Sequence, residues 1–132
     1  MSKKIIKTDK APLPIGPYNQ AVMIGSGTSG KIIFTAGQIA IDPKTNQVCP
    51  GGISEQTRMV LENIKGVLAG AGASLQNVIK STVYLQNMTD FHGMNMVYSE
   101  FFDPLTAPAR STVEVARLPK NVLIEIEVVA FV

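Results

Sequence analysis

The sequence predicts an α+β fold, in which one mixed sheet of six strands carries two helices on one face. Strand-like and helix-like segments follow each other as β-β-β-α-β-α-β-β, without the regular alternation of a parallel α/β fold. The chain has 132 residues, which suits a single domain over 1–132. Charged residues make up only 17% of the chain, against about 25% on average. This low charge favours a second sheet face that is buried against other subunits over one that is solvated.

The first half of the chain contains three extended segments. Residues 15–24 are entered through Pro17, residues 31–36 are β-branched and apolar, and residues 39–41 lead into a turn at 42–46. A glycine-rich loop over 25–30 separates the first two segments, which predicts that they form a hairpin.

Apolar residues at helical spacing predict two helices. The first begins at Ser54, a good N-cap residue, and ends at Gly70 and Gly72. The second begins near Thr89 or Asp90 and stops before the prolines that follow it. The apolar stripes of the two helices are Val60, Ile64, Val67, Leu68 and Ala71, and Phe91, Met94, Tyr98, Phe101 and Phe102.

The remaining strands are expected at 77–85, 110–117 and 122–132. The last of them alternates cleanly between apolar and acidic residues. One face carries Ile124, Ile126, Val128 and Ala130, and the other carries Glu125 and Glu127.

Charge and composition exclude several classes of function. The net charge is only +2 and no basic stripe is interleaved with aromatic residues, so we do not expect nucleic-acid binding. The single His92 rules out a histidine metal cluster and is expected at the surface. The single Cys49 indicates a reducing, cytoplasmic location and is expected to be a bystander. We expect no signal peptide or membrane span.

Two charged residues remain as candidates for chemistry. Arg110 opens a strand after a proline, where its rigid fork suits bidentate recognition of a carboxylate. Glu125 lies in an apolar strand, so it must pair with a cation or face a wet cleft where it could activate a water. Local spacing slightly favours a structural ion pair between them. Asn95 lies on the apolar face of the second helix, and a core amide that ties down a loop is preferred there over a substrate contact.

Three blocks of sequence, in order, resemble the reactive intermediate deaminase A (RidA) family. They are IGPYNQ at 15–20, FTAGQI at 34–39, and PARS at 108–111 with IEI at 124–126. The resemblance covers essentially the whole chain. Members of this family are also labelled enamine/imine deaminases, translation initiation inhibitors or L-PSP endoribonucleases.

The resemblance implies a chorismate-mutase-like fold and a homotrimer, in which three sheets form a central β-barrel with the helices outside and ligand clefts between subunits. It implies hydrolysis of the 2-iminopropanoate and 2-iminobutanoate tautomers of 2-aminoacrylate and 2-aminocrotonate. These enamine/imine acids are released by pyridoxal-phosphate-dependent dehydratases, and the products are 2-keto acids and ammonia. The family uses no metal or coenzyme.

The same resemblance assigns roles to residues of this chain. Arg110 matches the arginine that clamps the substrate carboxylate, and Glu125 matches the glutamate that positions the attacking water. Tyr18 matches the tyrosine that helps to hold that water, and the backbone N–H of Gly37 is expected to contact the ligand. Asn95 matches a polar residue near the site.

Two positions depart from the family pattern. Thr112 stands where many members have cysteine, and Ala36 stands where many have serine. Both are expected at the substrate-binding site, where they affect substrate range more than reaction type. Two other functions stay open: a regulatory trimer that binds 2-keto acids without turnover, and a ribonuclease or translation inhibitor. The near-neutral charge argues against the second.

Overall fold

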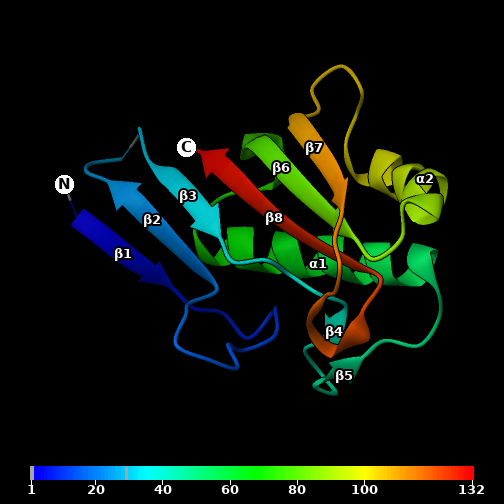
Figure 1. Cartoon of the computed structure of the whole chain (residues 1–132). Helices are drawn as coiled ribbons and strands as arrows, with labels where there is room; N and C mark the ends of the chain where they lie inside the picture. The colour runs from blue at the N-terminus through cyan, green and yellow to red at the C-terminus, as the bar shows by residue number, and fades with distance from the viewer. Residues whose placement is uncertain (1, 29) are drawn as a thin grey trace.

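The computed structural model describes residues 2–28 and 30–132, and its main element is a six-stranded sheet in the order β1-β2-β3-β8-β6-β7 (Figure 1). The parallel pair is β6–β7, and the other neighbours are antiparallel, so the sheet is mixed as predicted. The strands are β1 Ser2–Ile6, β2 Ala21–Gly25, β3 Ile32–Thr35, β6 Val78–Leu85, β7 Ala109–Glu114 and β8 Ile124–Phe131. The predicted hairpin is the β2–β3 pair, although Ser29 of its loop lies outside the described residues.

The membership of the sheet differs from the prediction at its N-terminal side. The lysine-rich start, absent from the predicted order, forms the edge strand β1 against β2. Residues 39–41 do not join the sheet, because β4 (Ile41–Asp42) pairs with β5 (Gln47–Val48) in a separate ribbon. The amide of Asn63 on α1 (Ile53–Gly70) donates to the carbonyl oxygens of Ile39 and Ile41, and so draws this segment towards the helix.

The extended segment predicted at 15–24 is a strand only from Ala21. Before it, the N–H of Tyr18 donates to the carbonyl of Gly16 at 2.8 Å, which closes a tight turn. The amide of Gln20, which is buried, binds three backbone carbonyls of the preceding segment, those of Thr8, Ala11 and Pro12. The Gln20 side chain therefore ties residues 8–12 to the start of β2, and residues 15–20 do not extend that strand.

The ends of α1 were predicted half correctly. Its N-cap is Gly52 and not Ser54, and the carboxylate of Glu55 accepts the N–H of Gly52 at 2.8 Å. The prediction was wrong because the helix already begins at Ile53, so Ser54 lies inside its first turn, and Glu55 satisfies the N–H of the cap residue. At the other end Gly72 has φ +76° and the N–H of Ala73 donates to the carbonyl of Leu68. This is the glycine stop expected there.

The second helix, α2, runs over Phe91–Phe101 and is preceded by a short 3₁₀ turn. The N-cap of α2 is Asp90, one of the two predicted residues, although its side chain makes no capping hydrogen bond. The side chain of Asn87 caps the preceding 3₁₀ turn by accepting the N–H of Thr89 at 3.0 Å. Two further 3₁₀ turns lie at Leu75–Asn77 and Pro119–Asn121.

The core lies between the sheet and the helices. In Figure 1 α1 runs behind the strands, and α2 lies beside the β6–β7 edge. Four residues of the predicted stripe of α1, Val60, Ile64, Val67 and Leu68, are buried, and Ala71 is half-buried just beyond the helix. The apolar face of β8 is buried as well. The largest fully buried side chains include Ile33, Leu61, Ile64, Leu68, Leu85, Met94, Ile124 and Ile126.

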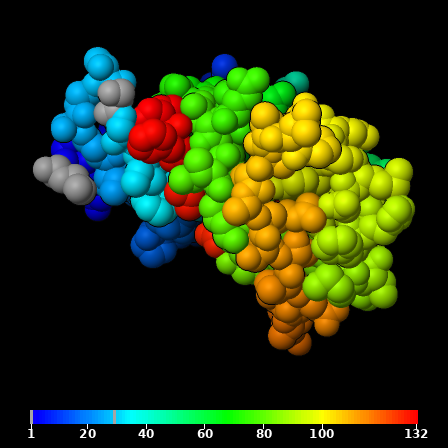
Figure 2. Space-filling model, turned by 90° about the horizontal axis from the view of Figure 1, so that it is seen from above, coloured from blue at the N-terminus to red at the C-terminus, as the bar shows by residue number. Residues whose placement is uncertain are grey.

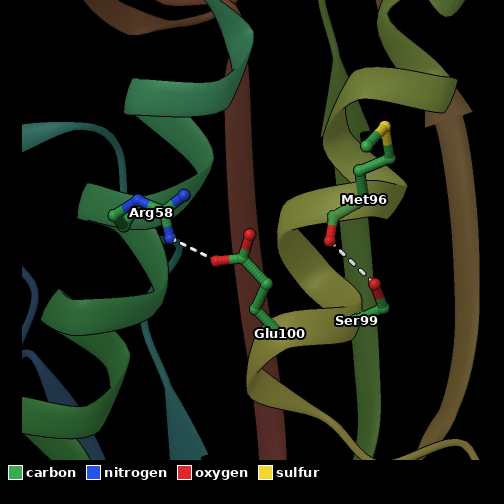
Figure 3. A network of polar contacts seen from close by, with 4 residues as sticks. All are labelled: Arg58, Met96, Ser99 and Glu100. Carbon is green, nitrogen blue, oxygen red and sulfur yellow. Dashed lines mark hydrogen bonds and ion pairs between the residues drawn. The ribbon is translucent and has the colours of Figure 1, made fainter.

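A polar contact joins the two helices on the outside. Arg58 on α1 binds Glu100 on α2 at 2.5 Å, and nearby the hydroxyl of Ser99 donates to the carbonyl of Met96 within α2 (Figure 3). Both charged side chains are about half exposed. Exposed ion pairs stabilise little, so the apolar contacts between the helices are the main source of stability here.

The second sheet face carries no helix within the described ranges (Figure 1). Its exposed residues are largely apolar: Ile5, Phe34, Val113 and Phe131. On this open face Tyr84 donates its hydroxyl to Glu127, and this hydrogen bond raises the pKa of Tyr84 to about 12. None of the helices formed by the described residues has the length and apolarity needed to cross a membrane.

Candidate active site

A cavity of about 360 Å³ opens where the segment after β3 meets the start of β8. It brings together four of the predicted site residues, Tyr18, Ala36, Gly37 and Glu125. Its complete lining is Ile15, Tyr18, Ala36, Gly37, Ile39, Pro119 and Glu125. Sequence reasoning missed Pro119, because a proline side chain carries no charge, donor or acceptor that would mark it as a site residue.

Gly37 and Glu125 are held side by side by backbone hydrogen bonds. The N–H of Gln38 donates to the carbonyl of Ile126 at 2.8 Å, and the N–H of Ile126 donates back to Gln38 at 3.1 Å. This isolated bridge places the Glu125 carboxylate against the Gly37 Cα, where an added Cβ would lie 2.0 Å from Oε1. A side chain at residue 37 would therefore force the Glu125 carboxylate to move. Among the described residues the N–H of Gly37 has no acceptor, so it can donate to a ligand.

The Glu125 carboxylate is half-buried on the open side of the sheet. Burial, and then the charge of Glu127 two residues along the same strand, raise the pKa of Glu125. A raised pKa makes a carboxyl group a better proton acceptor than an ordinary glutamate. Within the described residues Glu125 forms no ion pair.

Tyr18 lines the same cavity with its half-exposed ring. Its hydroxyl oxygen accepts the N–H of Ile15 at 3.3 Å, which directs the phenol along the loop. The loop itself is fastened to the sheet, because the N–H of Ala36 donates to the carbonyl of Gln20 at 2.8 Å. Gln20 belongs to the same block of sequence as Tyr18, and its role as the tie for this loop was not predicted.

Arg110 lies elsewhere, at the outer edge strand β7. Its Nη1 donates to the Asn95 side-chain oxygen at 2.8 Å, and its Cζ lies 4.6 Å from the ring centroid of Tyr98 and 5.6 Å from that of Phe91. Figure 2 shows β7 (orange) and α2 (yellow-green) next to each other, at the end of the molecule away from β1 and β2. Thr112, two residues along β7, shares the face of Arg110 and is half-buried.

The predicted role of Asn95 as a core amide is wrong. Its side chain is exposed, because the apolar face of α2 is formed by Met94, Val97 and Tyr98 and leaves Asn95 at the margin. There it accepts a hydrogen bond from Arg110.

The predicted ion pair between Arg110 and Glu125 is also absent. Arg110 pairs in register with Ser81, whose side chain points to the helices, whereas Glu125 pairs with Tyr84 on the open face. The two residues thus lie on opposite faces of the sheet. Arg110 and Glu125 are separated by three residues along the strand direction and by two strands across the sheet. Each of these separations is about 10 Å.

The structure agrees with the predictions for His92 and Cys49. His92 is exposed on α2. Burial raises the pKa of the Cys49 thiol, which disfavours the reactive thiolate. Cys49 is not part of the cavity lining.

Comparison with known proteins places the chain in a family. The family model described as Endoribonuclease L-PSP matches residues 8–132. A RutC family protein of Pyrococcus abyssi is 55% identical over 131 residues, covering 99% of this chain and 98% of the relative. TdcF of Escherichia coli, named as a proposed reactive intermediate deaminase, is 46% identical over 130 residues and covers 97% and 96%.

Solved structures agree with this placement. A Thermotoga maritima protein, described as a proposed endoribonuclease, has a TM-score of 0.90 and 47% identity, covering 98% of this chain and 97% of its own. The structure of E. coli TdcF with bound serine has a TM-score of 0.86 and 44% identity, covering 98% of both chains. The chain therefore belongs to the L-PSP/RidA family, and this confirms the resemblance seen in the sequence blocks.

Proposed function

We propose that this protein is an enamine/imine deaminase, which hydrolyses the imine forms of 2-aminoacrylate and 2-aminocrotonate to 2-keto acids and ammonia. Family membership and the name given to TdcF support this class of reaction. The observation that carries the proposal is the half-buried Glu125 carboxylate, which faces a cavity beside the unpaired N–H of Gly37. The substrates would come from pyridoxal-phosphate-dependent dehydratases.

The proposed chemistry uses only groups of the protein. Water adds to the carbon of the protonated imine, and Glu125 accepts a proton from that water. Glu125 then returns that proton to the nitrogen. As the C–N bond breaks, ammonia leaves and the new hydroxyl group gives its proton to Glu125, which forms the keto acid. Ammonia then takes this proton from Glu125 and departs as ammonium. The raised pKa of Glu125 suits it to these transfers. Tyr18 helps to hold the water, and the N–H of Gly37 donates to the ligand. Positioning supplies the remaining rate gain.

The separation of Arg110 from Glu125 supports a site that is shared between subunits. The guanidinium of Arg110 is the group that we propose binds the substrate carboxylate, yet Arg110 lies on the sheet face opposite to Glu125. We propose a homotrimer in which three open faces form a central barrel and each cleft combines Glu125 of one subunit with Arg110 of the next. The low charge content and the exposed apolar residues of the open face support this assembly. Asn95, Thr112 and Ala36 would complete the substrate-binding surface.

A coupled assay tests the reaction. A threonine dehydratase generates 2-aminocrotonate, and semicarbazide traps whatever is not hydrolysed. The wild type should suppress semicarbazone formation. Arg110→Ala should lower kcat/KM about 100-fold, because it loses a bidentate charge-assisted pair. Arg58→Ala, which removes an exposed arginine on α1, is the matched control and should retain activity.

Absence of any effect of the wild type, with serine-derived 2-aminoacrylate also tested, would refute the deaminase. A second function, a regulatory trimer that binds 2-keto acids, has the structure of TdcF with bound serine in its favour. Binding of 2-oxobutanoate without turnover would support it. The cytoplasmic location remains a prediction from the single Cys49.

A further inference from the structure

The guanidinium of Arg110 lies over the ring of Tyr98, and a hydrogen bond to Ser81 holds that ring in place. Tyr98 shares a hydrogen bond of 2.7 Å with the buried hydroxyl of Ser81. Ser81 is the register partner of Arg110 in the parallel β6–β7 pair. Three residues from three elements therefore form a closed arrangement, in which the strand partner of the arginine fixes the ring beneath the arginine.

We propose that Tyr98 is a positioning residue for Arg110, and that its ring, held by core packing as well as by Ser81, keeps the guanidinium in the orientation that receives the substrate carboxylate. This inference rests on the proposed function, because it assigns the substrate carboxylate to Arg110. Tyr98 itself need not touch the substrate.

The packing around Tyr98 supports a fixed ring. Phe102 packs against it with ring centroids 4.6 Å apart, and Tyr98 is 5% exposed. Burial raises the pKa of Tyr98, so the hydroxyl stays protonated and Arg110 meets a neutral ring. A cation over such a ring is attracted to its face.

Fixing the guanidinium in advance should favour substrate binding, because the arginine side chain is long and flexible. A free guanidinium must lose rotamer freedom when it binds a carboxylate through two hydrogen bonds. Here Asn95 takes one N–H of Arg110 and the Tyr98 ring takes one face of the guanidinium. The remaining N–H groups stay available to a carboxylate, and most of the ordering has already occurred before the substrate arrives.

The experiment compares three variants of the full-length protein in the coupled assay. Tyr98→Leu, which removes the ring, should raise KM about 10-fold and change kcat by less than about 3-fold. Tyr98→Phe keeps the ring and loses only the hydroxyl, so it should rescue KM to within about 3-fold of the wild type. Phe102→Leu removes a neighbouring core ring that does not contact Arg110, and it should lower stability while leaving KM unchanged.

A second readout is independent of turnover. The chain has only three arginines, Arg58, Arg110 and Arg117, so the side-chain ¹⁵N NMR signal of Arg110 can be assigned by substitution. Rotation about its Nε–Cζ bond should be slow in the wild type, in Tyr98→Phe and in Phe102→Leu, and fast in Tyr98→Leu.

The outcomes separate the two proposals. A folded Tyr98→Leu variant with the KM and the Arg110 signal of the wild type would overturn the positioning role. A wild type without turnover, whose Arg110 signal still becomes mobile in Tyr98→Leu, would refute the deaminase and support the positioning of Arg110. Should Tyr98→Leu fail to fold, Tyr98→Met takes its place, because it also removes the ring. The same 10-fold rise in KM and the same mobile Arg110 signal are expected, and wild-type values of both in that variant would overturn the proposal.

Discussion

The carboxylate of Glu125 lies directly against the Cα of Gly37, where a methyl group at residue 37 would come within 2.0 Å of Oε1. The two residues are 88 positions apart in the chain and meet only because the Gln38–Ile126 bridge aligns them. The position of the proposed proton-transfer group therefore depends on the absence of a side chain at residue 37.

Gly37→Ala should displace the Glu125 carboxylate and lower kcat/KM about 100-fold, as misplacement of a catalytic group by about 1 Å does. The coupled imine assay measures this. Gly52→Ala is the matched control, because its Cβ would make only an ordinary contact of 3.9 Å with Glu55. Full activity in Gly37→Ala would show that Glu125 can move without consequence.

Glu125→Gln should abolish hydrolysis and yet raise the free energy of unfolding at pH 7. The pKa of Glu125 is raised in the folded state, so its ionised form destabilises the fold. This cost is absent below the unfolded pKa, about 4.3, and is fully present once the pH exceeds the folded value. The advantage of the variant in urea unfolding should therefore disappear as the pH falls below about 4. If Glu125→Gln were more stable than the wild type by the same amount at every pH, the raised pKa of Glu125 would be contradicted. Glu62→Gln, at an exposed position of α1, is the control.

Phe34→Asp should dissociate the proposed trimer. Phe34 is 46% exposed in the middle of the open face, beside Val129 of β8. A buried aspartate there would be unpaired and costly. Light scattering should give the mass of three chains for the wild type and a smaller mass for Phe34→Asp, with loss of imine hydrolysis. Met96→Asp, on exposed α2, should remain a trimer. A monomeric wild type would refute the shared cleft.

Gly66→Ala should destabilise the protein by about 1–3 kcal/mol, although alanine is the better helix former. A Cβ at residue 66 would lie 2.3 Å from the carbonyl oxygen of Lys10, where the N-terminal segment crosses α1. Urea unfolding measures the change. Ser54→Ala is the control in the same helix and should stay within about 0.5 kcal/mol. A loss near 1 kcal/mol in Ser54→Ala would instead restore the serine cap.

Much of the local structure could be predicted from the sequence. The alternation along 124–130 predicted the buried and open faces of β8, with Glu125 on the open side. Helical spacing predicted the core stripe of α1, and the glycine at residue 72 predicted its end. The sequence blocks identified the family, and the comparisons confirm it.

Errors arose from contacts that periodicity does not show. The error at Ser54 is local, because the helix begins after Gly52, whose N–H is bound by Glu55. The error at residues 39–41 is long-range, because Asn63 of α1 binds the carbonyl oxygens of Ile39 and Ile41. Asn95 was expected in the core and is bound to Arg110 instead. None of these partners can be recognised from the periodicity of one segment.

The sequence by itself determined which face of each strand and helix is apolar, because the alternation of side chains along a strand and around a helix is a local property. It also determined which residue types are available for chemistry, Arg110 and Glu125 above all. Only the tertiary structure decided where those residues lie, on opposite faces of one sheet, with Arg110 over Tyr98 and Glu125 against Gly37. The reason is that strand register and close packing are set by contacts between residues far apart in the chain.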